Sequence, residues 1–113
     1  MDPNDVTAAG IQTLQDSIKK LNGLIQQPGA DIPGINEQIR QLIAEQTDLR
    51  AMELKQDLDD VSAQAAVQAL TDTAARLMAA AAKIKNVSTA CSDAAEVVNT
   101  ASLLITVLSP FLA

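Results

Sequence analysis

Aliphatic side chains recur every three or four positions along most of this sequence. Such spacing places apolar side chains on one face of an α-helix and leaves polar residues on the others. Asp2 and Pro3 are typical of a helix start, because a carboxylate accepts the free amides and proline suits the first turn. The pattern predicts a first helix over residues 4–27, whose apolar face holds Ile11, Leu14, Ile18, Leu21 and Ile25.

The clearest interruption is the stretch QQPGADIPG, residues 26–34. Two prolines and two glycines fall within seven residues there, which favours a loop. Beyond the loop the spacing resumes, and it predicts a second helix over residues 34–57. The inward positions of that helix are Ile35, Ile39, Leu42, Gln46 and Leu49.

The passage from the second to the third helix has two interpretations. In the first, Asp57, Asp59 and Asp60 form a tight turn and cap a third helix over residues 60–86. In the second, one helix continues from residue 34 to residue 85, a rod about 78 Å long. The absence of Gly and Pro between Gly34 and Pro110 permits the rod. We favour the turn, because so long a helix is rare in a small domain.

The spacing shifts by one residue near Asn86 and then continues to the end of the chain. Ser88 or Thr89 is suited to cap a last helix, predicted over residues 88–110. Its inward positions include Cys91, Ala94, Val98, Ala101, Ile105, Leu108 and Leu112. Four helices of similar length predict an all-α, antiparallel four-helix bundle that forms a single domain over residues 1–113.

The C-terminal segment, residues 97–113, carries no charge, and this raises the question of a membrane helix. On a helical wheel its aliphatic residues occupy one broad arc, while Ser92, Glu96, Asn99, Ser102 and Thr106 gather on the other side. A bundle helix requires this segregation, whereas a membrane span does not. The segment is also shorter than the roughly 20 residues that cross a bilayer. We therefore predict a core helix of a soluble bundle.

A second apolar stripe on the last helix has no obvious neighbour within the bundle. It consists of Leu103, Val107 and Phe111, at positions i, i+4 and i+8. Extra apolar surface of this kind indicates a contact with another molecule, although a central place in the bundle would also cover it. We predict an interface there, with Leu54 and Leu58 as a second candidate. The expected partner is a second copy of the chain, giving a dimer, or another protein.

Composition and charge restrict the partners. The net charge is −6, and the eight Lys and Arg residues are scattered, whereas a nucleic-acid surface needs clustered basic residues. The same acidity disfavours anionic lipid. The start MDPND lacks the basic and apolar regions of a secretory signal. We predict no nucleic-acid partner and a cytoplasmic location, with export that needs no cleaved signal left open.

The sequence contains few residues that are suited to catalysis. The chain has no His, which removes the usual general base and the commonest transition-metal ligand. Cys91 has no basic neighbour in sequence and is best interpreted as a small core side chain. The acidic residues Asp57, Asp59 and Asp60 lack the alternating oxygen ligands of a calcium loop. We predict no catalytic residue, no cofactor and no metal site.

These observations favour a non-enzymatic helical bundle that acts by protein–protein interaction or self-association, as an adaptor, a chaperone-like protein or an immunity-type binder does. The alternative is a membrane-active or pore-forming protein that uses its apolar C-terminal helix. An enzyme is a distant third. No motif in the chain assigns it to a family.

Overall fold

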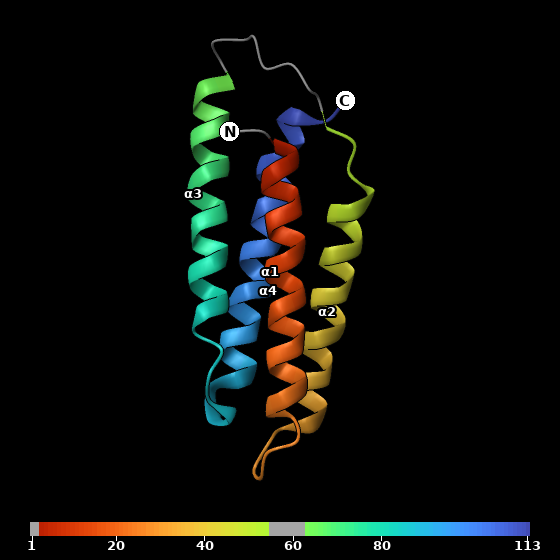
Figure 1. The fold of residues 1–113 in the computed structure, drawn as a ribbon, viewed down its shortest axis with the longest axis vertical. Helices are drawn as coiled ribbons and strands as arrows, with labels where there is room; N and C mark the ends of the chain where they lie inside the picture. The colour runs from red at the N-terminus through yellow and green to blue at the C-terminus, as the bar shows by residue number, and fades with distance from the viewer. Residues whose placement is uncertain (1–2, 55–62) are drawn as a thin grey trace.

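The computed structural model describes residues 3–54 and 63–113, and the predicted all-α four-helix bundle is confirmed (Figure 1). Short 3-10 turns lie on either side of the last helix. The helices are α1 (Pro3–Leu24), α2 (Ile32–Ala51), α3 (Ala63–Ala82) and α4 (Ala90–Leu108), and the turns are η1 (Val87–Thr89) and η2 (Ser109–Phe111).

Successive helices run in opposite directions along the bundle (Figure 1). α1 packs beside α2, and α3 packs beside α4, so the chain forms two antiparallel hairpins. The hairpins lie side by side, with α1 against α3 and α2 against α4. α2 and α3 therefore occupy opposite corners. The main contacts between the hairpins join parallel helices, and α1 also contacts the antiparallel α4.

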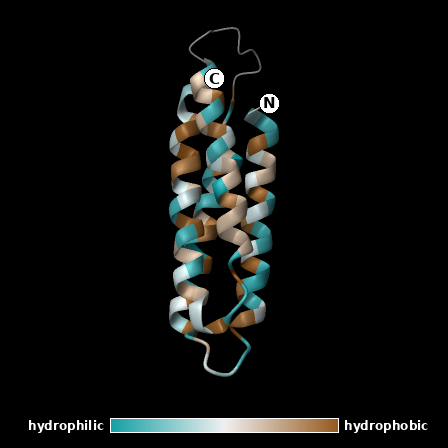
Figure 2. Ribbon diagram, turned by 90° about the vertical axis from the view of Figure 1, so that its left-hand side faces the viewer, coloured by the Kyte–Doolittle hydropathy of each residue, from teal (hydrophilic) through white to brown (hydrophobic). Residues whose placement is uncertain are grey.

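The core follows the predicted spacing. Apolar residues from all four helices are almost completely buried, among them Leu14, Leu21, Ile35, Leu42, Leu49, Leu70, Leu77, Ala94, Ala101, Leu104 and Leu108. Each helix also carries hydrophilic residues, as an amphipathic bundle requires (Figure 2). Gln46 interrupts the apolar stripe of α2 and is buried. Its Nε2 donates to the Ile11 carbonyl oxygen at 3.2 Å and to Gln15 Oε1 at 3.1 Å, which offsets the loss of water.

Gly10 lies on the buried face of α1. A Cβ atom at this position would stand 3.1 Å from Leu104 Cδ2, 3.6 Å from Leu49 Cδ1 and 3.9 Å from Leu77 Cδ2. These leucines belong to the three other helices. Glycine weakens a helix interior, but here it allows α1 to approach the centre of the bundle.

α2 begins earlier than predicted, at Ile32, because Asp31 caps it. The Asp31 carboxylate accepts a hydrogen bond from the Gly34 amide at 3.1 Å, and Pro33 occupies the first turn, where no amide donor is needed. α1 ends at Leu24 rather than at residue 27. The connecting loop is therefore residues 25–31, and Gly29 takes a left-handed φ of 82° within it.

The predicted end of the second helix at residue 57 is wrong. Met52 is extended, with φ −73° and ψ 129°, and α2 stops at Ala51. One continuous helix from residue 34 to 85 is therefore not formed. The physical reason is tertiary: the extended backbone brings Leu54 into the core, where it is 9% exposed. The predicted turn at residues 57–60 lies outside the described residues.

The other predicted boundaries shift by a few residues. α3 spans Ala63–Ala82 instead of residues 60–86. α4 is preceded by the η1 turn, and Thr89 stands at its N-cap position without a capping hydrogen bond from its side chain. The predicted capping role of Ser88 or Thr89 is therefore wrong for Thr89. The 3-10 turn itself connects the chain to α4.

The C-terminal end departs most from a regular helix. α4 gives way to the η2 turn, which contains Pro110, and a 3-10 helix advances about 120° per residue instead of about 100°. Leu112 then forms an isolated antiparallel bridge with Leu54, and the Ala113 amide donates to the Glu53 carbonyl oxygen at 2.9 Å. This extended pairing ties the end of the chain to the residues that follow α2.

Candidate interaction surface

The structure separates the residues of the predicted interface. Leu103 is 36% exposed, and Val107 is half-buried against the core. Phe111, by contrast, is 1% exposed, and Leu54 is also buried, so both belong to the core. Leu58 lies outside the described residues. The stripe of three exposed residues is therefore not present as predicted, and Leu103 is its most accessible member.

The change at Phe111 has a clear physical cause. Helical spacing places Leu112 inward and Phe111 on the second stripe. The wider angular step of η2 reverses the two, so Phe111 turns into the core and Leu112 is left 42% exposed. The signal available in the sequence was Pro110, which disfavours a regular helix at this point.

A surface groove of about 520 Å³ lies beside Leu112, at the end of the bundle where α2 and α4 finish. The extended residues after α2 form one side of it, and the last turns of α4 form the other. We call it the C-terminal groove. It is lined by Asp48, Ala51, Met52, Glu53, Ile105, Ser109, Leu112 and Ala113.

The apolar part of the C-terminal groove consists mainly of Met52, Ile105 and Leu112. Met52 and Ile105 are half-buried and pack against the core, while Leu112 projects further into solvent. None of the three was predicted to belong to a site. They are brought together by the pairing of Leu54 with Leu112, a contact between distant parts of the chain.

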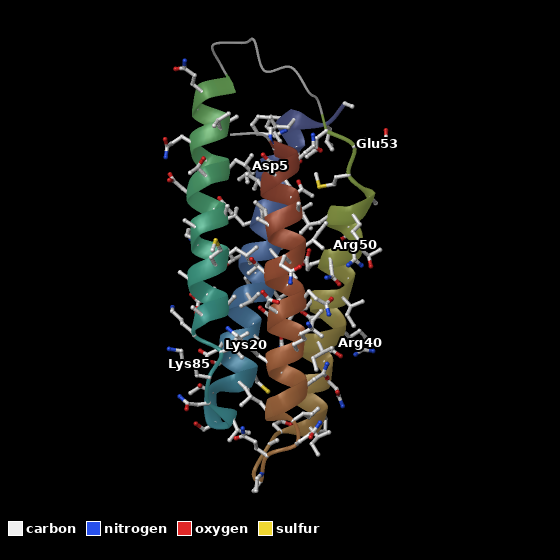
Figure 3. All side chains as sticks on the ribbon, viewed as in Figure 1. Asp5, Lys20, Arg40, Arg50, Glu53 and Lys85 are labelled. Carbon is white, nitrogen blue, oxygen red and sulfur yellow. The ribbon has the colours of Figure 1, made fainter. Side chains whose placement is uncertain are left out.

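The charged residues of the C-terminal groove are acidic. Asp48 and Glu53 line it, and no Lys or Arg is among its described lining residues. Figure 3 shows Glu53 on the outside of the bundle, just beyond α2. One turn before Asp48, burial raises the pKa of Glu45, and the negative charge of Asp48 raises it further. A hydrogen bond from the Ser102 side chain acts in the opposite direction.

Other exposed apolar residues lie outside the C-terminal groove. Ile32 and Ile43 lie on α2, and Met78, at 62% exposure, lies on α3. Met78 borders a smaller hollow of about 170 Å³ that it shares with Asp16 and Lys20. The C-terminal groove is therefore the larger of these two hollows and gathers more aliphatic side chains.

Cys91 lies at the opposite end of α4, beside the cap of α2. Its Sγ donates to Asp31 Oδ2 at 3.7 Å. Burial raises the pKa of the Cys91 thiol, and the negative charge of Asp31 raises it further. An activated nucleophile needs the opposite shift, so this thiol is not prepared for nucleophilic chemistry.

Metal ligands do not gather in the part of the chain that the structure describes. No group of three or more His, Cys, Asp or Glu side chains there is arranged to hold an ion. The acidic residues Asp57, Asp59 and Asp60, which sequence analysis considered for calcium, lie outside this part.

The last helical segment passes a simple test for a membrane span. Among the described residues, Val87–Phe111 is long and apolar enough to cross a bilayer. Within it, 44% of the apolar 18-residue stretch is buried in the bundle. The core helix of a soluble protein passes the same test, since its inward face is equally apolar.

No family model, no curated protein and no solved structure matches this chain.

Proposed function

We propose that this protein is a non-enzymatic helical bundle that acts by binding another polypeptide at the C-terminal groove. The supporting observation is that Met52, Ile105 and Leu112 share one open groove at the surface. Apolar side chains gathered in a concave surface gain free energy when a partner removes them from water, at about 25 cal/mol per Å². Methionine adapts its shape to different partners, which suits such a surface.

The backbone around this groove supports the same proposal. Leu112 is held by its bridge to Leu54 and by the hydrogen bond from Ala113 to Glu53. A side chain on a fixed backbone loses little conformational freedom when a partner binds, and this favours affinity. Leu103, also on α4, offers a second contact position. The partner is either another protein or a second copy of the chain.

Site-specific photo-crosslinking tests this function. A photoreactive phenylalanine derivative is placed at Leu112, at Leu103 or, as the matched control, at the exposed Met78, and the protein is irradiated in its native cells. We expect polypeptide adducts at position 112, fewer at 103 and few at 78, identified by mass spectrometry. Adducts with the chain itself would establish self-association. Equal yields at 112 and 78, or no polypeptide adduct at 112, would contradict the proposal.

A membrane-active protein is the second candidate, favoured by the apolar Val87–Phe111 segment. In that case the segment leaves the bundle and its buried face meets lipid. Dye-loaded vesicles provide the measurement: release of the dye on addition of the protein supports membrane activity. Lipid adducts at positions 103 and 112 in the crosslinking experiment would support the same role, and intact vesicles would argue against it.

A further inference from the structure

We propose that the occupant of the C-terminal groove is a segment of another protein that carries Lys or Arg beside aliphatic side chains. This inference rests on the proposed binding function and adds the chemistry of the partner. Three observations carry it: the aliphatic floor, the acidic rim and the absence of basic side chains from the described lining.

The aliphatic floor selects aliphatic side chains. Met52 and Ile105 pack against the core from opposite sides of the groove, and Leu112 stands beside them with 42% of its surface exposed. Because the three share one groove, an incoming Leu or Ile can cover them together. The volume of about 520 Å³ is large enough for several such side chains.

The acidic rim selects cations. Asp48 and Glu53 border the aliphatic floor, and Glu45 lies one turn further along α2. Burial raises the pKa of Glu45, and the negative charge of Asp48 raises it further, so these two carboxylates repel each other. A Lys or Arg at the rim would relieve this repulsion, whereas a partner carboxylate would increase it. The net charge of −6 would also speed the approach of a cationic segment.

The same charges disfavour two other occupants. A two-fold symmetric dimer centred on the C-terminal groove would bring Asp48 and Glu53 of both copies together. An anionic lipid surface would face the same carboxylates. A cationic segment would place opposite charges beside Asp48 and Glu53. We therefore assign the groove to such a segment.

Three short synthetic peptides with a fluorescent label test the inference. The first peptide is designed as a helix with Leu on one face and Lys on the other. The second has Glu in place of Lys, and the third has Ser in place of Leu. We expect binding of the Leu/Lys peptide, measured by fluorescence anisotropy, and at least about tenfold weaker binding of the other two. Affinity for the Leu/Lys peptide should fall as salt screens the charges.

Variants of the groove locate the binding. Leu112→Ser should weaken the Leu/Lys peptide about tenfold, because it removes the most exposed part of the floor. The double variant Asp48→Asn/Glu53→Gln should weaken it several-fold and flatten its salt dependence. Met78→Ser and Asp72→Asn, which change exposed residues outside the groove, are the matched controls and should leave binding unchanged.

The outcomes separate the inference from the function on which it rests. Equal affinity for the Leu/Lys and Leu/Glu peptides, or loss of binding in the control variants as well, overturns the cationic partner. Neither result affects the proposed binding function, which the crosslinks at position 112 test separately. If light scattering shows a dimer that Leu112→Ser dissociates, the groove is occupied by a second copy and the inference is also wrong. No binding of any peptide overturns it as well.

Discussion

α2 and α4 lie side by side along the bundle, yet the two ends of this contact are built differently. At the first end, Asp31, Gly34 and Cys91 meet so closely that a Cβ atom on Gly34 would lie 2.3 Å from Asp31 Oδ2 and 2.9 Å from Cys91 Sγ. At the other end, the same two helices border a groove of about 520 Å³. One end is closed by small residues and a helix cap, and the other is open.

The difference shows what closes a gap between helices. Glycine and a short polar cap allow two helices to meet at the first end, and the capping bond from the Gly34 amide fixes the start of α2. At the second end both helices stop. The chain after α2 is extended, and the chain after α4 passes through η2 before Leu112 pairs with Leu54. Extended backbone fills less space than a helix, and a groove remains. The consequences of the two arrangements are open to measurement.

The largest effect is expected at the open end, from Phe111→Ala. Phe111 is almost completely buried, and its removal leaves a cavity that the surrounding helices fill only in part. We expect the free energy of unfolding to fall by about 3–5 kcal/mol, measured by urea denaturation. The neighbouring Leu112→Ala should cost less than about 1 kcal/mol, because Leu112 is partly exposed. Equal losses for the two variants would contradict the change of register at η2.

A smaller effect is expected at the closed end, from Gly34→Ala. The new methyl group displaces Asp31 or Cys91 and disturbs the cap, so we expect a loss of about 1–3 kcal/mol although alanine favours helix. Gly23→Ala is the control, because a Cβ there meets nothing within 4 Å. It should stabilise the protein by up to about 1 kcal/mol. Thermal and urea unfolding measure the change in the free energy of unfolding for both variants. A change of the same sign in both would show that the closed end has room for a methyl group.

The smallest effect concerns Glu45, between the two ends. Its pKa is raised in the folded protein, so folding favours the protonated carboxyl. Its contribution to stability is therefore present at acidic pH and is lost as pH rises above 4.5, the ordinary value, and through the folded pKa. Glu45→Gln should gain stability relative to the native chain as pH rises, by no more than about 0.5 kcal/mol after solvent screening. Urea unfolding at pH 4 and pH 7 gives the difference, and a difference of opposite sign would contradict it.

The sequence predicted the helices well, because the inward leucines of each helix recur at the spacing that burial requires. Leu14, Leu42 and Leu108 are all buried as expected. It did not predict the end of α2. The residues after Ala51, such as Glu53, are tolerated in a helix, and local preference gave no reason to stop. The helix ends there because Leu54 is buried and its backbone pairs with Leu112, a contact between residues far apart in the chain.

The candidate site was predicted only in part, for a related reason. Leu103 lies within the regular part of α4 and is exposed, as helical spacing indicates. Phe111 follows Pro110, where the geometry changes, so the same spacing gave the wrong face. Met52, Ile105 and Leu112 come together only in three dimensions. A pattern along one helix cannot indicate a groove that two separate chain segments form.

Cys91 allows a chemical reagent to probe the closed end of the contact between α2 and α4. It is the only cysteine in the sequence, so a maleimide or iodoacetamide reagent modifies one known position. In the folded protein the thiol is half-buried beside Asp31 and ionises reluctantly, which slows alkylation. The rate of labelling therefore reports on the surroundings of this thiol, where α2 and α4 meet, with no engineered probe.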